Sequence, residues 1–238
     1  MSSDQHRNIA FSLNSRFQEL DSERRRTWTP DALAVYDNQR AELVREHSKH
    51  PFVGLGDTLP DVTLVRTDGK PISLDAVATA GPAVLIFFRF AGCPACNIAL
   101  PYYRDTLWPA LSAARVPLIG ISPQPITLLH EIVKRHQLPF PIASDENLGL
   151  SRALGITYVF NDASRKSSEA NGGTSQALNG TSSWELPKPA VIIIDQHRVV
   201  RFADISPDWI IRTETPAILD ALRLSGKKAS QGAYSEPV

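Results

Sequence analysis

The sequence predicts an α/β fold in which helices cover a mainly parallel sheet. Three short apolar runs, at 83–88, 116–122 and 189–195, are typical of buried strands. Segments with helical spacing separate these runs, and turn residues at 67–69 and 196–198 indicate hairpins beside them. Alternation of buried strands with helices is typical of βαβ units, whose strands run parallel.

A helical extension is expected before this domain, over residues 1–51. Apolar residues recur at helical spacing in 6–20 and again in 30–47. The charged segment 21–26 is expected to break the two helices, and Thr29-Pro30 supplies an N-cap followed by proline at the first helical position. Neither helix can bury its apolar stripe alone, so we expect both to pack on the main domain or on another subunit.

The main domain is expected over residues 52–224, followed by a flexible tail at 225–238. After the first buried strand, we expect a helix at 97–111, a second strand, a helix at 125–137, a short strand at 140–144 and a capped helix at 145–154. Residues 161–183 are rich in Asn, Ser and Gly, which predicts a surface loop or partly disordered insertion. A last strand, its hairpin partner and a helix at 215–224 complete the domain.

The composition excludes several classes of partner. The 238 residues hold 25 basic and 25 acidic side chains, so no excess of charge attracts nucleic acid or an anionic membrane. No apolar run approaches the ~20 residues that span a bilayer, and the start of the chain lacks the pattern of a signal peptide. We therefore expect a cytoplasmic protein, with no nucleic acid and no membrane among its partners.

The motif with the clearest chemistry is Cys93-Pro94-Ala95-Cys96, which stands where the first buried strand meets a helix. Free backbone N–H groups and the helix dipole stabilise a thiolate there and lower its pKa. Two cysteines within one helical turn can also close a disulfide with little backbone movement. The spacing therefore predicts a reactive dithiol.

Two other interpretations of the cysteine pair are weaker. A zinc site needs about four ligands, whereas this chain has only two cysteines, and His130 and His136 lie too far along the chain for a finger. Inert buried thiols are the other alternative, against which Pro94 and the start of the helix argue. We expect no metal and no cofactor.

The order of elements resembles the thioredoxin-fold superfamily, and more closely the peroxiredoxin-like (alkyl hydroperoxide reductase/thiol-specific antioxidant) family. Where peroxiredoxins have Pro-x-x-x-Thr-x-x-Cys, this chain has Arg89-Phe90-Ala91-Gly92-Cys93-Pro94-Ala95-Cys96. Pro101, five residues after the second cysteine, is similar to the proline that kinks the thioredoxin active-site helix. The resemblance covers about residues 52–224 and implies a thioredoxin-like fold: a central mixed sheet flanked by helices.

The resemblance also implies roles for particular residues. Cys96 falls on the peroxidatic position and Cys93 on the threonine, which makes Cys93 the resolving partner. Arg212 is the candidate for the family's active-site arginine, with an ion pair to Glu214 as the alternative, and Arg89 is a second candidate. Pro189 matches the thioredoxin cis-proline and, with Phe90 and Gly92, is expected to contact substrate.

The implied activity is a thiol-dependent peroxidase. Cys96 attacks a hydroperoxide and becomes a sulfenic acid, Cys93 closes a disulfide with it, and an external thioredoxin- or glutathione-type reductant regenerates the pair. One alternative is a thioredoxin-like thiol–disulfide oxidoreductase with Cys93 as nucleophile, and another is a non-enzymatic redox sensor. Because relatives commonly dimerise, a homodimer is also expected.

Overall fold

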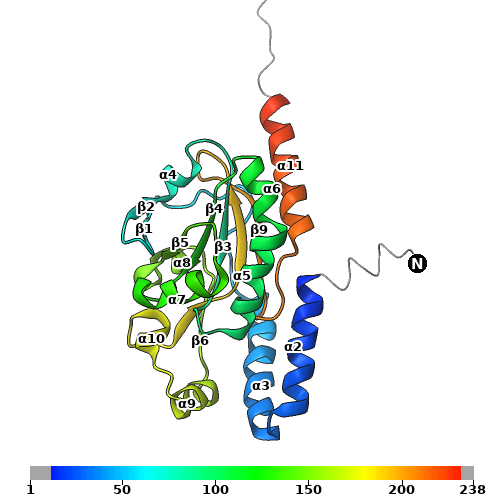
Figure 1. The fold of residues 1–238 in the computed structure, drawn as a ribbon, viewed down its shortest axis with the longest axis vertical. Helices are drawn as coiled ribbons and strands as arrows, with labels where there is room; N and C mark the ends of the chain where they lie inside the picture. The colour runs from blue at the N-terminus through cyan, green and yellow to red at the C-terminus, as the bar shows by residue number, and fades with distance from the viewer. Residues whose placement is uncertain (1–11, 232–238) are drawn as a thin grey trace, which may run out of the picture.

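A computed structural model of the chain describes residues 12–231 and contains a seven-stranded mixed sheet with helices on both faces (Figure 1). The strand order is β2-β1-β5-β4-β3-β8-β9. The strands are β1 (Thr63–Arg66), β2 (Pro71–Ser73), β3 (Ala83–Phe87), β4 (Leu118–Ser122), β5 (Ile142–Ser144), β8 (Ala190–Ile194) and β9 (Val200–Ile205).

The sheet is mixed, as the resemblance implies, and the expectation of a mainly parallel sheet is wrong. Only the pairs β3–β4 and β4–β5 are parallel, whereas β1–β2, β1–β5, β3–β8 and β8–β9 are antiparallel. The two hairpins account for the pairs β1–β2 and β8–β9, because a short turn can join only antiparallel strands. The central strands are buried on both faces, which explains their continuous apolar runs.

Alternate residues of β3 enter two separate cores. Val84 and Ile86 face one core, formed with α5, α7, α11 and the N-terminal helices, whereas Leu85 and Phe87 face the other, formed with α4 and α8. The helices of the domain are α4 (Leu74–Ala78), α5 (Pro94–Thr106), α6 (Trp108–Ala113), α7 (Ile126–His136), α8 (Gly149–Ala153), which follows the short 3₁₀ helix η1 (Glu146–Leu148), and α11 (Thr215–Gln231).

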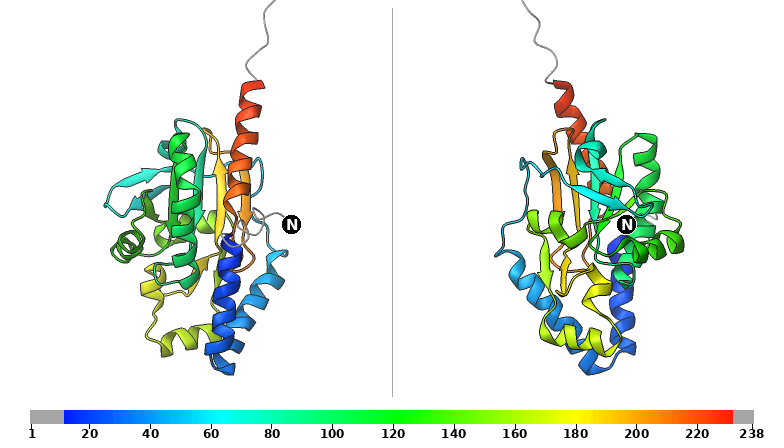
Figure 2. Two further views of the ribbon diagram at one scale, coloured as in Figure 1. Left: turned by 45° about the vertical axis from the view of Figure 1, so that its right-hand side comes forward. Right: turned by 90° about the vertical axis from the view of Figure 1, so that its left-hand side faces the viewer.

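The N-terminal extension is a helical hairpin of α2 (Leu13–Thr27) and α3 (Pro30–His47), which lie side by side in Figures 1 and 2. The predicted break at 21–26 is wrong, because these charged residues continue α2, which ends at Thr27. The Arg25 side chain explains the continuity: it bonds to Asp21 one turn earlier and to Asp37 on α3. The predicted start of the first helix, at 6–11, lies outside the described residues.

Residues 161–183 are more ordered than expected, and the prediction of a loop is wrong. They form α9 (Asp162–Ala170) and α10 (Ser175–Asn179), whose N-caps Asn161 and Thr174 each accept a backbone N–H. A two-stranded antiparallel sheet of β6 (Thr157–Val159) and β7 (Glu185–Pro187) closes the base of this insertion. The N-caps favour these two helices, although the polar side chains of α9 leave no buried residue on that helix.

Three helix boundaries also differ from the predictions. The helix expected at 97–111 is split into α5 and α6 at Leu107, and the one expected at 145–154 is divided where Asn147 and Leu148 take positive φ values of 58°. The last helix ends at Gln231 instead of Leu224, so the predicted tail begins as helix, and residues 232–238 lie outside the described residues. Within residues 12–231, no helix combines the length and the apolar character that crossing a bilayer requires.

Candidate active site

The two cysteines occupy the first turn of α5, directly after the buried strand β3. Cys93 is the N-cap of the helix, Pro94 takes the first helical position, and Cys96 follows within the same turn. Both are free thiols, with side chains 1% and 0% exposed. The predicted junction of strand and helix is confirmed, and it brings both sulfurs to the positive end of the helix dipole.

Each sulfur has its own arginine. Arg89 Nη1 lies 3.7 Å from Cys93 Sγ, and Arg212 Nη2 lies 3.6 Å from Cys96 Sγ. The two arginines are only 7% and 5% exposed, and among the described residues neither forms an ion pair with a carboxylate. The structure therefore gathers four of the predicted site residues, with two buried cations at two thiols.

The charges divide the pair into a thiolate and a thiol. Burial by itself raises the pKa of Cys93, but a hydrogen bond from the Cys96 thiol and the charges of Arg89 and Arg212 lower it well below its ordinary value. Burial and the same hydrogen bond raise the pKa of Cys96 well above its ordinary value. Both shifts favour the thiolate at Cys93 over the thiolate at Cys96.

An aromatic cage surrounds Arg89. Its guanidinium carbon lies 4.5 Å from the ring centre of Trp209, 5.5 Å from that of Phe160 and 6.0 Å from that of Tyr158. The Arg89 Nε and the Tyr158 hydroxyl are buried without a hydrogen-bond partner. Burial raises the pKa of Tyr158 to about 12, so its hydroxyl stays protonated at neutral pH.

The turn before the cysteines is held by polar side chains of β4 and the residues after it. The Ala91 N–H donates to Gln124 Oε1 over 2.7 Å, and Ser122 Oγ donates to the Arg89 carbonyl over 2.9 Å. Gln124 Nε2 also donates to the carbonyl of Ala177 on α10. The insertion therefore supports the cysteine turn through one glutamine.

The other predicted contact residues of this turn lie beside the cysteines. Phe90 is partly buried, with its ring 5.2 Å from the Arg89 guanidinium carbon. Gly92 is exposed, and a Cβ there would meet only the Phe90 ring at 3.7 Å, so the turn does not require glycine for space.

The peptide bond before Pro189 is trans, whereas the resemblance implies a cis bond. No peptide bond within residues 12–231 is cis, so the cis-proline implied by the resemblance is wrong. The chain passes extended from β7 to β8: the Lys188 N–H donates to Ile156, and the Pro189 carbonyl accepts the Ser206 N–H. The trans form fits this extended path and is the favoured isomer of an X–Pro bond.

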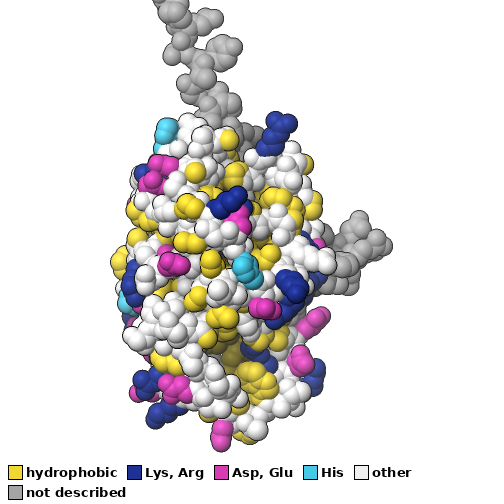
Figure 3. Space-filling view, turned by 60° about the vertical axis from the view of Figure 1, so that its left-hand side comes forward, with side chains coloured by type: hydrophobic (Ala, Val, Ile, Leu, Met, Phe, Trp, Pro, Cys, Tyr) yellow, Lys and Arg dark blue, Asp and Glu magenta, His cyan; other side chains and the backbone are white. Residues whose placement is uncertain are grey.

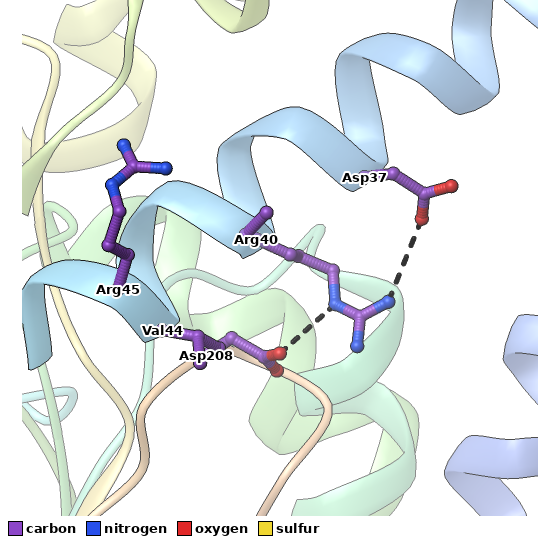
Figure 4. Close-up of a pocket in the computed structure, with 6 residues that line it drawn as sticks. Asp37, Arg40, Val44, Arg45 and Asp208 are labelled. Carbon is purple, nitrogen blue, oxygen red and sulfur yellow. Dashed lines mark hydrogen bonds and ion pairs between the residues drawn. The ribbon is translucent and has the colours of Figure 1, made fainter.

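Arg212 belongs to a loop, 206–214, that the N-terminal hairpin holds from outside. Arg40 Nε on α3 lies 3.1 Å from Asp208 Oδ2, and Figure 4 shows this pair between α3 and the loop. Lys188 Nζ bridges the carbonyls of Leu43 and Pro207, at 3.3 and 2.8 Å. The hairpin and the loop are therefore joined by one ion pair and one buried ammonium.

Glu214 anchors the other end of this loop and does not pair with Arg212. Its carboxylate accepts the N–H groups of Leu13 and Asn14 and the Tyr102 hydroxyl, at 3.0, 2.8 and 2.8 Å. It therefore caps the start of α2, and the ion pair considered for Arg212 is absent from the described contacts of Arg212.

Sequence reasoning missed Trp209, Tyr158 and Gln124. Trp209 lies three residues before Arg212, the candidate active-site arginine, which was a usable signal. Tyr158 and Gln124 carry no motif, because their roles depend on the folding of β6 and β4 beside the cysteine turn.

Comparison with known proteins identifies the relatives of the chain. The family model described as "AhpC/TSA family" matches residues 55–203. A Mycobacterium tuberculosis protein named as a peroxiredoxin is 28% identical over 101 residues, 42% of this chain and 65% of that protein. Chloroplastic peroxiredoxin Q of Sedum lineare is 27% identical over 113 residues, 48% of this chain and 60% of that protein. The chain thus spans less than two thirds of the length of these relatives.

A solved structure supports the same fold. The crystal structure of peroxidoxin BcpB from Mycobacterium tuberculosis matches with a TM-score of 0.54 and 21% identity, over 76% of this chain and 98% of that one. The family match covers the sheet up to the middle of β9, the cysteine turn and the insertion, and leaves out the N-terminal hairpin, the loop 206–214 and α11. The fold, the cysteine turn and the family match together show that the chain belongs to the AhpC/TSA family.

Proposed function

We propose that the protein is a thiol-dependent peroxidase that reduces hydroperoxides through the Cys93–Cys96 pair. The observation that carries this proposal is a buried dithiol at a helix N-terminus in which each sulfur contacts its own unpaired arginine. Such a site stabilises a thiolate and also the negative charge that develops on oxygen when an O–O bond breaks.

The chemistry takes three steps at the cysteine pair, and the third needs an external reductant. A thiolate attacks the distal oxygen of the hydroperoxide, the O–O bond breaks, and the leaving alkoxide takes up a proton as the alcohol. The resulting sulfenic acid condenses with the second thiol to a disulfide and releases water. An external dithiol then supplies two electrons and two protons and restores both thiols.

The location of the charge favours Cys93 as the attacking sulfur. Its pKa is the lowered one of the pair. Both sulfurs are buried, but the arginine that contacts Cys93 lines a cavity, whereas the arginine that contacts Cys96 does not line it. The family motif places the reacting sulfur at Cys96, an order that requires the proton to move from Cys96 to Cys93 first. That role of Cys96 stays a prediction.

Stopped-flow oxidation of the reduced protein by hydrogen peroxide tests both the function and the order. In Cys96→Ser, Cys93 should still react once and leave a sulfenic acid that dimedone traps at Cys93. In Cys93→Ser, the fast phase should be lost. If the fast phase is retained in Cys93→Ser and lost in Cys96→Ser, Cys96 is the attacking sulfur. If the wild type consumes no peroxide, the proposed peroxidase function is wrong.

A second candidate function is favoured by the same lowered pKa of Cys93. An acidic first cysteine suits a thiol–disulfide oxidoreductase, in which Cys93 attacks a substrate disulfide and Cys96 resolves it. Reduction of insulin disulfides, measured beside peroxide consumption, separates the two functions.

The remaining partners follow as proposals. The disulfide needs a thioredoxin- or glutathione-type reductant, and a protein that depends on such a reductant suits the cytoplasm. A homodimer is proposed from the habit of the family, while the contacts of the hairpin described above lie within one chain.

A further inference from the structure

A cavity of about 580 Å³ lies between the N-terminal hairpin and the insertion, and Arg89 lines it. We call it the hairpin cavity. Its aromatic walls come from Trp28, Tyr36, Phe160 and Trp209. Figure 3 shows a hollow lined with hydrophobic side chains on the lower half of the face where α9 approaches α3.

The hairpin cavity is built by elements that the family match leaves out or that had been expected as a loop. Trp28 and Tyr36 come from residues before position 55, where the match begins. The Asn161 N–H and its side-chain amide bond to Gln39 and Glu42 on α3, at 2.8 and 2.9 Å. These bonds hold α9 opposite α3. The two walls of the cavity are therefore kept in place by specific hydrogen bonds.

At the Arg89 end of the cavity, one donor of the guanidinium lacks an acceptor. The Arg89 Nε is buried without an acceptor, the guanidinium is 7% exposed, and the nearby Tyr158 hydroxyl is also unpartnered. Buried donors of this kind cost free energy unless something accepts their hydrogen bonds. An oxygen atom of a ligand bound at this end of the cavity would supply an acceptor to Arg89.

We infer that the hairpin cavity binds the organic part of an aromatic hydroperoxide and presents its –OOH group to Arg89, whose Nη1 lies 3.7 Å from the Cys93 sulfur. This inference rests on the proposed function and assigns its substrate class. A volume of about 580 Å³ is of the size that holds small organic ligands and far exceeds hydrogen peroxide. The aromatic walls favour stacking with a planar ring, and the uncharged lining apart from Arg89 favours an uncharged body.

Two measurements test the inference. The first compares kcat/KM for cumene hydroperoxide and for hydrogen peroxide with the same reductant, and we expect a preference of about tenfold or more for the aromatic substrate. The second follows binding of 2-phenyl-2-propanol, the alcohol that cumene hydroperoxide yields, through the protein's tryptophan fluorescence, to which Trp28 and Trp209 contribute from the cavity wall. Binding should be saturable, and it does not depend on catalysis.

Ala32→Phe fills the cavity, because Ala32 lines it from α3. We expect this variant to lose alcohol binding and about tenfold in kcat/KM for cumene hydroperoxide, with the value for hydrogen peroxide kept within twofold. Ala34→Phe is the matched control, since Ala34 is exposed on the same helix outside the cavity. Ser168→Phe repeats the test from α9 if Ala32→Phe does not fold.

The outcomes separate this inference from the proposed function. A wild type that consumes hydrogen peroxide, with no preference for the aromatic substrate or with equal losses in Ala32→Phe and Ala34→Phe, overturns the inference alone. A wild type that consumes neither hydroperoxide overturns both. Selective loss in the filled variants supports it.

Discussion

At the scale of single residues, the departures of this chain from the peroxiredoxin motif form a contact pair. Arg89 stands where the family has proline and Cys93 where it has threonine, and Arg89 Nη1 lies 3.7 Å from Cys93 Sγ. A cation introduced together with a thiol stabilises the thiolate of that thiol. The two substitutions therefore act together, and they add a second sulfur–arginine pair to that of Cys96 and Arg212.

Replacing Arg89 should raise the pKa of Cys93. Arg89→Met keeps a side chain of similar length but removes the charge, and we expect a rise of about one unit or more. Because the thiolate is the reactive form, alkylation by iodoacetamide near neutral pH should slow, and its half-maximal rate should move to higher pH. Arg66→Met, at a surface ion pair with Asp68, is the control and should leave this pH profile unchanged. An unchanged profile in Arg89→Met would contradict the assigned charge.

At the scale of elements, the loop 206–214 and the N-terminal hairpin stabilise each other. Glu214 caps α2, so Glu214→Ala should cost about 1 kcal/mol of stability, since the Leu13 and Asn14 N–H groups lose their acceptor. Hydrogen exchange should quicken first in the opening turn of α2. Glu19→Ala, exposed on the same helix, is the control. Equal exchange in both variants would show that the cap does not hold the helix.

Lys188 should make the stability of this contact depend on pH. Burial lowers the pKa of Lys188 to about 8, from 10.5 in an ordinary environment. Between these values the unfolded chain binds the proton and the folded chain does not, so stability rises with pH across this window. Relative to Lys188→Met, the wild type should gain on the order of 2 kcal/mol between pH 8 and 10.5 in urea unfolding. Lys49 is exposed just after α3, so the stability of Lys49→Met should depend on pH as that of the wild type does. If stability instead changes with pH in the same way in Lys188→Met and the wild type, Lys188 is not the group responsible.

The sequence predicts elements that depend on local pattern and misses those that depend on distant contacts. The buried strands and the cysteine turn follow from apolar runs and one motif, and the structure confirms them. The continuity of α2 depends on Asp37 from another helix, and α9 is held by Gln39, so neither could be inferred from its own segment. The same holds for Tyr158, whose proximity to Arg89 arises only in the folded sheet.

At the scale of the whole molecule, the hairpin completes the core on one side of the sheet. Leu13, Phe17, Tyr36 and Leu43 are each no more than 6% exposed and belong to the same apolar core as the cysteines. Phe17 also approaches Arg212, whose guanidinium carbon lies 5.9 Å from its ring centre. The extension is therefore part of the domain's stability and of the surroundings of its site.

Deleting residues 1–50 should consequently destabilise the protein while leaving its number of subunits unchanged. Each large apolar side chain lost from the core costs about 1.5–3 kcal/mol, and a domain's whole stability is about 5–15 kcal/mol. Thermal unfolding should show the loss, and light scattering should give the same number of subunits for both chains. A truncated protein of unchanged stability that becomes monomeric from a dimer would instead make the hairpin a subunit interface.

Phe17→Ala keeps this test decisive if the truncated chain does not fold. Removal of one buried ring should cost about 3–5 kcal/mol, whereas Gln18→Ala, exposed on the next position of α2, should cost little. Because Phe17 lies against Arg212, the variant should also weaken the hold on Cys96, seen as slower closure of the Cys93–Cys96 disulfide after one equivalent of peroxide. If Phe17→Ala loses stability but closes the disulfide at the normal rate, the hairpin has only a structural role. If it loses stability and also closes the disulfide more slowly, the hairpin contributes to the chemistry of the site.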